Sequence, residues 1–600
     1  MLRFEKGIDV LRMLAMTMLL NATSQSAVII SEINYHPLEG EELVDKNLYE
    51  FIEIKNTGIS EVNLSGYCFN KGITYSFPAE TKIGAGEFIV LATDELRFEE
   101  RYGFAPFGIY AGKLDNSGER ITLSDTIRGK TIFSVSYGTN VPWPSSADGA
   151  GFSLVPVNPN GGTGSPDDAY YWRASSAVRG SPGSDDPSQT TISPVLINEV
   201  LTHTDEPEYD AIEIYNPNST EADISGWYLT DDKQNPKKYQ IPAGTVLSPN
   251  SYMVFDERQF NKLDDPLAFS LSAHGDGVFI FSASQGTLTG YSHGFTYGEI
   301  DNGTTFGRIV TSTGEEHFPA MAQATLGQQN SLPRNGPVIV TEVNYNPSNG
   351  LSYIEIKNIS AVTVDLFDPL RPANTWQVGG VGFSFPQNTS LLPGEVAVII
   401  AALVDPHTFK AVYGLSADTK VFSYTGTLST SGESITIRMP CEPYLEAGSV
   451  DSIVPYMDID KISYSSDTPW PVCADGYSLS RKAEILYAND PANWIATATS
   501  PGVPVLHHSS SQQKKTFSVS YRKNRIQLRF LDIPADPISY SVLSLNGKIL
   551  YRGYKFIAPD GDQSITIDAR LPKGIYMLKV ESGRYTISEK VVTTSSASRF

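Results

Sequence analysis

Six glutamates recur in pairs along this chain of 600 residues, and they are the residues best placed to carry chemistry. Two carboxylates at a suitable separation can act as general acid and general base, or they can bind a hard cation such as calcium. Either role needs the pair to face a substrate or an ion. The pairs are Glu32 with Glu53, Glu199 with Glu213, and Glu342 with Glu355.

An asparagine stands three residues after the second glutamate of each pair. Asparagine side chains at strand ends cap the backbone groups of the following turn. We therefore interpret the glutamates and asparagines mainly as structural residues that fix strand ends by hydrogen bonding. Contact with a cation or ligand is the second interpretation and catalysis is the third. The asparagines are Asn56, Asn216 and Asn358.

The other residue types that support catalysis or metal binding are scattered along the chain. No Ser/His/Asp arrangement is readable, and no Cys or His pair has the spacing of a zinc site. The acidic turns at Asp231-Asp232 and at 560–562 lack the ligand spacing of a dedicated calcium loop. We expect a protein that is not an enzyme and has no cofactor, with weak calcium binding left open.

Three cysteines leave at least one thiol unpaired. Cys441 and Cys473 fall within one repeat of the chain, so a disulfide between them and two free thiols are both compatible with the sequence. Cys68 has no partner in its own repeat, and we interpret it as a small side chain on a strand.

The glutamate pairs belong to three copies of one longer pattern. The copies open with VIISEINYHP from Val28, VLINEVLTHT from Val195 and VIVTEVNYNP from Val338, and each continues into a strand that contains Ile-Glu-Ile. A period of roughly 150 residues has the size of an independent domain and is too long for a solenoid repeat. Short alternating runs separated by Gly and Pro turns predict an antiparallel β-sandwich of immunoglobulin-like size.

Charge and the N-terminus indicate an exported protein. The formal net charge of −22 opposes nonspecific binding to nucleic acid and to anionic membranes, so we expect no nucleic-acid partner. Basic residues precede the apolar stretch from Met13 to Leu20, and small residues follow it, which predicts a signal peptide over residues 1–27. No other stretch has the roughly 18 apolar residues of a membrane span, so no transmembrane segment is expected.

The order of these motifs resembles the lamin tail domain in its bacterial, secreted form. The matching features are the opening strand with its glutamate, the Ile-Glu-Ile strand ending in asparagine, the Ser-Gly-aromatic turn of V-N-L-S-G-Y and A-D-I-S-G-W, and a Pro/Gly-led apolar strand. The third copy lacks the Ser-Gly-aromatic turn, and the second lacks the tryptophan segments near the end of the module. The resemblance implies three such domains, at residues 28–183, 194–332 and 337–502.

A separate domain is expected at residues 515–592. From Lys514 to Val592 the chain has fourteen Lys or Arg against seven Asp or Glu, unlike the acidic remainder. The segments LNGK, LPKGIY and the final Lys590-Val-Val resemble the C-terminal sorting domain of type IX secretion, although eight further residues follow. The resemblance implies a small β-sandwich that contacts the secretion machinery; a sandwich without sorting function is the alternative.

These features predict an all-β protein of tandem immunoglobulin-like sandwiches, exported to the cell surface or the extracellular space. No long segment remains for a separate catalytic domain. We therefore expect a non-catalytic adhesive, scaffold or extracellular binding module whose partner is an unidentified protein or glycan. One alternative is a polysaccharide-binding accessory protein with several weak sites. Another is an exported hydrolase with its active site in the module loops.

Overall fold

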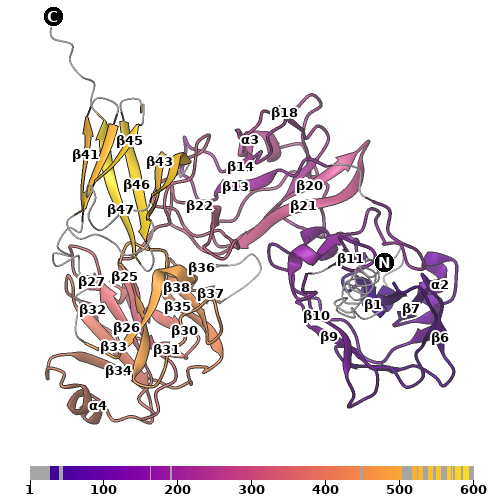
Figure 1. The fold of residues 1–600 in the computed structure, drawn as a ribbon, viewed down its shortest axis with the longest axis horizontal. Coiled ribbons are helices and arrows are strands. Elements are labelled where there is room, and N and C mark those ends of the chain that lie inside the picture. Colours follow the sequence, from indigo (N-terminus) through magenta and orange to yellow (C-terminus); the bar gives the residue numbers. More distant parts are fainter. Residues whose placement is uncertain are drawn as a thin grey trace, which may run out of the picture. The chain divides into compact units, whose positions relative to one another are not determined.

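The computed structural model describes most of the chain (Figure 1). The predicted signal peptide, the acidic turn at 560–562 and the segment 503–516 lie outside the described residues. The described residues are 28–38, 45–162, 164–188, 192–445 and 451–502, followed by 517–522, 525–530, 538–544, 549–555, 564–568, 571, 574–582 and 585–593.

The predicted all-β class is confirmed, because antiparallel sheets make up almost all of the regular structure. The chain forms two compact units, residues 1–504 and 505–600. The first contains the three repeated segments, which are called the first, second and third modules with the bounds predicted above. Those bounds stay a prediction.

The first module is a sandwich of a six-stranded sheet, β12-β11-β1-β2-β7-β8, and a four-stranded sheet, β10-β9-β4-β5. Its elements are β1 (Val28–Asn34), η1 (Lys46–Tyr49), β2 (Phe51–Asn56), β3 (Val62–Asn63), β4 (Cys68–Lys71), β5 (Tyr75–Ser76), β6 (Lys82–Ile83), β7 (Phe88–Ala92), α2 (Glu95–Tyr102), β8 (Gly108–Ile109), β9 (Arg120–Ser124), β10 (Thr131–Ser136), η2 (Ser145–Ala147), β11 (Leu154–Pro156), η3 (Ala169–Tyr171) and β12 (Trp172–Ala174).

The second module has a smaller main sheet, β19-β14-β13-β22, facing β17-β16-β20-β21. Its elements are β13 (Leu196–Leu201), β14 (Ala211–Tyr215), β15 (Ala222–Asp223), β16 (Tyr228–Thr230), β17 (Tyr239–Gln240), β18 (Val246–Leu247), β19 (Tyr252–Asp256), α3 (Glu257–Phe260), β20 (Asp276–Ser284), β21 (Thr287–Tyr297), β22 (Thr305–Gly307), β23 (Ile309–Val310) and β24 (Glu316–His317).

The third module again has six strands in its main sheet, β34-β33-β26-β25-β39-β40, facing β31-β30-β35-β38. Its elements are β25 (Val338–Asn344), β26 (Tyr353–Asn358), β27 (Val364–Asp365), β28 (Phe367–Asp368), β29 (Arg371–Thr375), β30 (Gln377–Gly379), β31 (Phe383–Ser384), β32 (Ser390–Leu391), β33 (Val396–Ala401), α4 (Pro406–Tyr413), β34 (Lys420–Tyr424), β35 (Gly432–Pro440), β36 (Tyr444–Leu445), β37 (Ser452–Ile453), β38 (Tyr456–Ser465), β39 (Tyr477–Arg481), η4 (Pro491–Asn493) and β40 (Trp494–Ala498).

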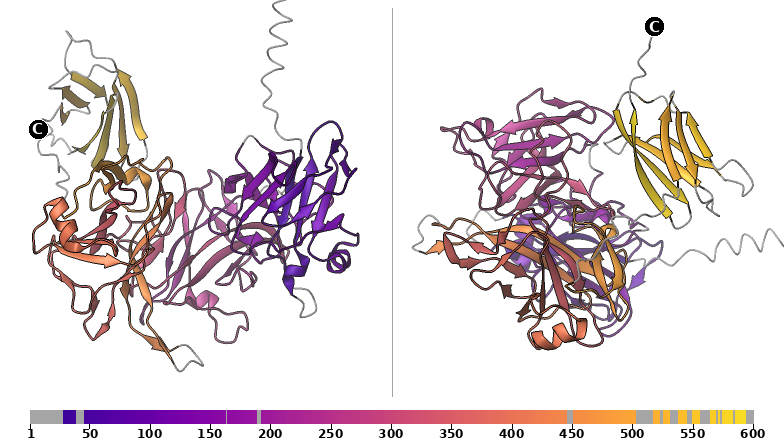
Figure 2. Two further views of the ribbon diagram at one scale, coloured as in Figure 1. Left: turned by 90° about the horizontal axis from the view of Figure 1, so that it is seen from below. Right: turned by 90° about the vertical axis from the view of Figure 1, so that its left-hand side faces the viewer.

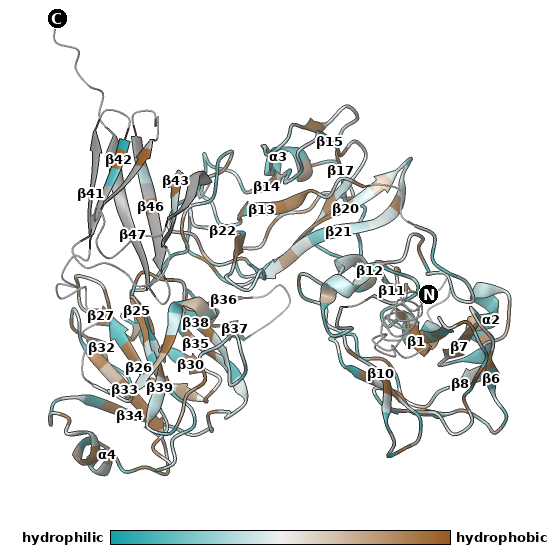
Figure 3. Ribbon diagram, in the orientation of Figure 1, coloured by the Kyte–Doolittle hydropathy of each residue, from teal (hydrophilic) through white to brown (hydrophobic). Residues whose placement is uncertain are grey.

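Each module encloses its own apolar core between its two sheets. The isoleucines of the Ile-Glu-Ile strand point inward, as the alternation of a strand requires, and all six are 0 or 1 % exposed. Figure 3 shows the hydrophobic colouring on central strands such as β13. A main core in each module fits three domains of similar size, and a smaller buried cluster joins the first module to the second through Phe152 and Phe281.

Short helices follow the third main-sheet strand of the first and third modules. Helix α2 begins after Asp94, whose side chain accepts from the Arg97 N–H, and ends at Gly103 with a φ of 78°. Helix α4 has the same design, with Asp405 at its start and Gly414 at its end. An acceptor at the N-cap and a left-handed glycine at the C-terminus are common helix boundaries.

The described residues of the second unit form seven strands in two sheets, β41-β42-β45 and β44-β43-β46-β47, which are yellow in Figure 2. Lys590 and Val592 lie on the last strand. The strands are β41 (Phe517–Arg522), β42 (Arg525–Phe530), β43 (Ile538–Ser544), β44 (Ile549–Lys555), β45 (Ser564–Asp568), β46 (Gly574–Ser582) and β47 (Tyr585–Thr593).

Candidate functional site: a buried carboxylate pair in each module

The two glutamates of each pair face each other across neighbouring strands. Glu32 pairs with Glu53, Glu199 with Glu213 and Glu342 with Glu355 in the strand register. In every module a β-bulge lies directly before the first glutamate. All six residues are at most 1 % exposed. The strands thus place two carboxylates side by side in the interior, where an unsatisfied charge is costly.

The residue at each bulge donates a hydrogen bond to the second glutamate. Ser31 Oγ lies 2.6 Å from Glu53 Oε1, and Thr341 Oγ1 lies 2.6 Å from Glu355 Oε1. In the second module the donor is Asn198 Nδ2, 2.7 Å from Glu213 Oε1. A short polar side chain directly before the first glutamate is therefore part of the site. The extra residue of a bulge re-aims a side chain in this way.

The end of each module donates backbone hydrogen bonds to both carboxylates through a three-residue segment, which we call the clip: Ser181-Pro182-Gly183, Thr325-Leu326-Gly327 and Ser500-Pro501-Gly502. The N–H of its first residue binds the first glutamate at 2.8 to 3.0 Å in the three modules. The N–H of its glycine binds the second glutamate, at 2.5 Å in the first module and 2.7 Å in the third, with the same contact from Gly327 to Glu213. The clip ties the C-terminal end of a module to its first two strands.

Hydroxyl groups complete the set of donors around the first glutamate. The clip residue Thr325 donates through Oγ1 to Glu199 Oε2 at 2.8 Å, and Ser500 does the same to Glu342 at 3.1 Å. A strand or loop hydroxyl donates as well, from Ser153 to Glu32, from Thr305 to Glu199 at 2.6 Å, and from Ser478 to Glu342. Tyr353 is a further donor to Glu342. The carboxylate oxygens of all three pairs are thus engaged by groups of their own module.

Glycine is required near the clip. Gly183, Gly327 and Gly502 have φ values of 89°, 83° and 70°, which favour glycine. At Gly180, with a φ of 77°, an added Cβ would lie 2.0 Å from Glu32 Oε1. The backbone approaches the carboxylates so closely that no side chain fits at Gly180.

Burial raises the pKa of the second glutamate in each pair. The pKa of Glu53 and that of Glu213 rise to about 7, and that of Glu355 rises to about 8, because removal from water disfavours the charged form. The charge of the first glutamate adds to the rise in Glu213 and Glu355. For Glu32, burial and then the charge of Glu53 raise the pKa well above its ordinary value. The second glutamate of each pair therefore keeps its proton to a higher pH than an exposed glutamate does.

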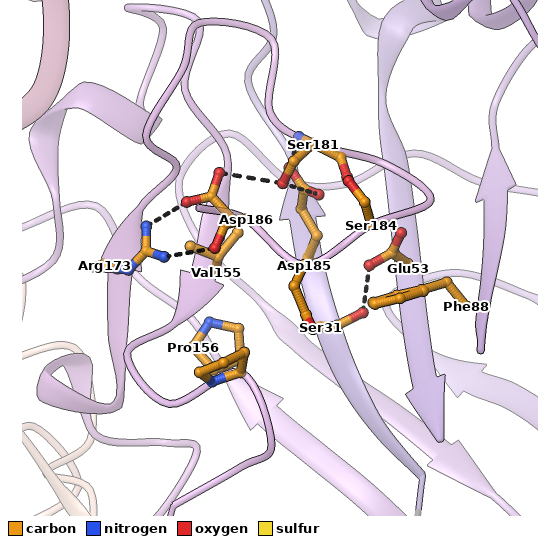
Figure 4. Close-up of a pocket in the computed structure, with 12 residues that line it drawn as sticks. Ser31, Glu53, Phe88, Val155, Pro156, Arg173, Ser181, Ser184, Asp185 and Asp186 are labelled. Carbon is orange, nitrogen blue, oxygen red and sulfur yellow. Dashed lines mark hydrogen bonds and ion pairs between the residues drawn. The ribbon is translucent and has the colours of Figure 1, made fainter. Parts of the chain in front are cut away.

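The surroundings of the first pair leave little room for a ligand. The adjacent pocket encloses about 10 Å³ of free space, about enough for one water molecule. Figure 4 shows Ser31 directed at Glu53, and Asp186 between Arg173 and Ser181. Arg173 and Asp186 form an ion pair of 2.6 Å. Among the described residues, no group of three His, Cys, Asp or Glu is placed to hold a metal ion.

The three asparagines tie the end of the second strand to the loop and strand that follow. Asn56 Nδ2 donates to the carbonyls of Ser60 and Ile83 at 2.8 and 3.0 Å, and its Oδ1 accepts from the Gly58 N–H at 2.9 Å. Asn216 and Asn358 make the equivalent contacts. All three are buried. They act on backbone groups at a turn and not on the glutamates.

The remaining candidate residues do not gather at the carboxylate pairs. Cys68, Cys441 and Cys473 are free thiols in the structure, and Cys441 and Cys473 pack separately against the core of the third module. Asp231 pairs with Lys238, and Asp232 accepts from the Gln234 N–H. These acidic residues are therefore already engaged within their own turn.

The sequence reasoning missed the residues that bind the glutamates. The donors before the first glutamate, the strand or loop hydroxyls and the clip were not singled out. A usable signal exists, because Ser-Pro-Gly closes both the first and the third copies. The second copy has Thr-Leu-Gly, which keeps the hydroxyl and the glycine.

Comparisons with known proteins identify two kinds of domain. Residues 21–139 and 188–296 match the Lamin Tail Domain family, and residues 522–594 match the Secretion system C-terminal sorting domain family. The chain therefore contains lamin tail sequence in two regions and a sorting domain at its C-terminal end. The predicted presence of both domain types is confirmed; the matched ranges do not include the third module.

Similar solved structures are remote. A DUF4876 family protein from Bacteroides thetaiotaomicron is 13 % identical, with 37 % of this chain and 86 % of that chain covered and a TM-score of 0.17. A tetra-tandem repeat from the extending region of a large adhesion protein is 8 % identical, covering 94 % of this chain and 97 % of that chain with a TM-score of 0.10. A BSP domain of a biofilm associated protein is 8 % identical over 96 % of this chain and 97 % of that chain, with a TM-score of 0.11. The comparison with curated proteins gave no match.

The sorting domain fixes the destination of the protein. Chains with this domain are exported by type IX secretion to the cell surface or the extracellular space, which confirms the predicted localisation. The same domain implies contact with the secretion machinery. Within the described part of the chain, no helix has the length and apolar character to cross a membrane. The predicted signal peptide stays a prediction.

Proposed function

We propose that this protein is a non-catalytic surface protein that serves as an adhesive, a scaffold or an extracellular binding module. One observation carries the proposal: the most conspicuous carboxylate pairs of the chain are used internally, in the same way, in all three modules. Their oxygens accept from the bulge residue, the hydroxyl donors and the clip. A general acid or base needs to reach a substrate proton, and at no more than 1 % exposure these groups do not.

The third module is proposed to be a lamin-tail-like domain as well. Its opening strands have the same register and the same bulge as those of the first and second modules. Its small pair β27-β32 corresponds to β3-β6 and β15-β18. Its clip binds its glutamates through the same atoms. These shared features support a count of three domains, with the bounds predicted from the sequence.

A direct test measures the turnover of substrates by the chain and the retention of ligands on the immobilised chain. The mature chain, from residue 28, is assayed against ester, phosphodiester and glycoside substrates. The same chain, immobilised, is exposed to a panel of polysaccharides and extracellular proteins. We expect no turnover and retention of at least one protein or glycan. Turnover that disappears in Glu53→Gln, Glu213→Gln or Glu355→Gln would overturn the proposal, and so would a chain that retains nothing.

The matched control is Glu61→Gln. Glu61 is an exposed glutamate of the first module that pairs with Lys82 on the surface. This variant keeps the carboxylate pair and the clip, so its retention should equal that of the parent chain.

A further inference from the structure

Strand β19 is an open edge in the second module, although the equivalent strands of the other two modules are covered. The equivalence follows from the register, because Val254 pairs with Glu213 as Val90 pairs with Glu53 and Val398 with Glu355. Strands β7 and β33 each have a parallel neighbour on their outer side, β8 and β34. In the described part of the chain, β19 pairs only with β14.

The covered strands show which backbone groups the open edge presents. In the first module, the N–H of Phe107 donates to Val90 O at 2.8 Å, and the N–H of Tyr110 donates to Ala92 O at 3.0 Å. The positions equivalent to Val90 and Ala92 are Val254 and Asp256. Their backbone groups therefore point away from β14, toward the side where β8 and β34 lie in the other modules. The N–H of Asp256 already donates to Gln259 Oε1 at 2.9 Å, so the open donor of this pair of positions is that of Val254.

The exposure of the strands agrees with this difference. Val90 is 4 % exposed and Val398 is 0 % exposed, but Val254 is 36 % exposed. The strand β33 is buried at every position except its last, whereas β19 is buried only at Phe255. An edge strand with unpaired backbone groups and an exposed apolar side chain is a template for pairing with another chain.

The outer face beside this edge is also uncovered. In the first and third modules, Phe98 of α2 and Phe409 of α4 pack on the outer face of the main sheet. Helix α3 has only four residues, and its Phe260 instead packs into the core of the second module against Phe269. The segment after it is exposed, with Leu263 at 100 %. The second module thus lacks both coverings of its third main-sheet strand.

The third module shows how a strand fits at this place. Lys420 to Tyr424 pair with Ala397 to Ala401, with Val421 against the outer cluster and Phe422 against the inner core. A segment that adds to β19 in the same way would bring an apolar side chain against Val254 and another against the core edge. Backbone hydrogen bonds give such strand addition its affinity, and alternate side chains give it selectivity.

Charge indicates the kind of segment that would bind. Residues 194–332 contain nineteen Asp or Glu against six Lys or Arg. Exposed acidic residues stand in the segment before β14 and in the segment after β19: Asp205, Glu206 and Glu208 in the first, and Asp264 and Asp265 in the second. The N–H of Glu257, directly after β19, donates to the Asp210 carbonyl, directly before β14. A negative surface attracts a basic partner and speeds its association.

We propose that β19 binds an extended, basic segment of a partner protein as an added β-strand, in the position that β34 occupies in the third module. The inference deepens the binding role proposed above and rests on it. The second module is then the peptide-binding domain of the chain. In the first and third modules the equivalent edges are already paired with β8 and β34.

The test uses two synthetic peptides and the full mature chain. Both peptides contain the β34 sequence Lys-Val-Phe-Ser-Tyr; one is flanked on each side by two lysines and the other by two glutamates. We expect the lysine-flanked peptide to bind at least tenfold more tightly in a fluorescence anisotropy titration. We also expect it to slow amide exchange at Val254; the Asp256 N–H already donates to Gln259 Oε1 at 2.9 Å and is not a reporter. Exchange at the equivalent positions Val90 and Val398, which are already covered, should not change.

Two variants test the backbone and the charge separately. Val254→Pro removes the outward N–H of an edge position, where proline is compatible with a strand, and should weaken binding at least tenfold. Asp264→Lys with Asp265→Lys changes only exposed loop residues and should reduce the preference for the lysine-flanked peptide several-fold. A matched charge reversal far along the chain, Asp418→Lys in the third module, should have no effect.

Three results would overturn the inference. These are equal binding of both peptides, no protection at β19, or protection at β19 in the peptide-free chain together with self-association. If the chain still retains a ligand in the panel described above, such a result removes the strand-addition surface and leaves the proposed binding role standing. If the chain retains nothing there, the proposed function itself fails.

Discussion

The second module differs from the first and third at its edge and outer face, but it is the same at its carboxylate pair. The first and third modules have an eight-residue helix and a parallel strand beside the third main-sheet strand. Among the described residues, the second module has only the four-residue α3, whose Phe260 packs into the core, and no strand outside β19. The glutamates, the bulge and the clip are present in all three. The invariant part closes the domain, so the variable part is where the modules can differ in what they bind.

The largest expected change in stability comes from the helices α2 and α4, which pack on the outer face of the main sheet in the first and third modules. Phe98 and Phe409 are fully buried, so Phe98→Ala and Phe409→Ala should each lower the free energy of unfolding by about 3 to 5 kcal/mol. Val254→Ala at the uncovered face should cost about 0.5 kcal/mol or less. Module-resolved hydrogen exchange in the full chain measures all three. A large loss from Val254→Ala would show that the edge of the second module is covered after all.

The second prediction concerns the part that all modules share. Glu342→Ala leaves Ser478, Ser500 and the clip amide without their acceptor, and each buried unsatisfied donor costs about 1 to 3 kcal/mol. We expect a loss of about 2 to 4 kcal/mol in the third module, and a similar loss in the second from Glu199→Ala. Urea-dependent proteolysis of the two modules gives both values. A loss in only one module would break the equivalence of the pairs.

The third prediction tests the close approach of the backbone to the first pair. At Gly180 an added Cβ would clash with Glu32, whereas at Gly86, with a similar φ of 75°, nothing lies within 4 Å. Both substitutions by alanine strain a left-handed backbone, at roughly 1 kcal/mol. Gly180→Ala should cost about 1 to 2 kcal/mol more than its control Gly86→Ala. Equal melting shifts for the two variants would contradict the geometry of the clip.

The sequence allowed the fold and the positions of the glutamates to be predicted, because both leave local traces. The alternation around Ile52 and Ile54 and the recurrence of Glu53 are visible within a few residues. The donors to Glu32 are not local: Ser153 and Ser181 stand 121 and 149 residues away in the chain. Only the closed sandwich brings them together, so the engagement of the carboxylates required the structure.

The open edge at β19 could not be predicted from the sequence, for a related reason. In all three modules the apolar third main-sheet strand is followed by a helical segment. It comes after Asp256 in the second module, as it comes after Ala92 and Ile400 in the other two. A four-residue helix and a helix of eight residues begin with similar capping residues, Asp256 and Asp94. Whether the chain then returns to pair beside the strand depends on packing around Phe260, which no local pattern specifies.

The smallest expected effect is a pH dependence shared by the carboxylate pairs. A pKa of about 8 for Glu355 in the folded chain exceeds the ordinary glutamate value of about 4.3, so the folded state binds the proton more tightly than the unfolded state. By linkage, the contribution of Glu355 to the free energy of unfolding is fully present below about pH 4 and falls as the pH rises toward about 8. Glu53 and Glu213, with pKa values of about 7, should lose their contribution to the free energy of unfolding by about pH 7.

We expect the third module to unfold in urea more readily at pH 8.5 than at pH 5.5, with a free energy of unfolding lower by about 1 kcal/mol or more. Glu355→Gln should reduce this difference between the two pH values. Glu316, whose pKa is lowered to about 2 by hydrogen bonding and charge from His293 and Arg308 despite burial, has no equivalent titration in this range. If Glu355→Gln leaves the pH dependence unchanged, or if stability is flat between pH 5.5 and 8.5, the pairs are ionised throughout this range, and the clip would then have to stabilise two charges in each module.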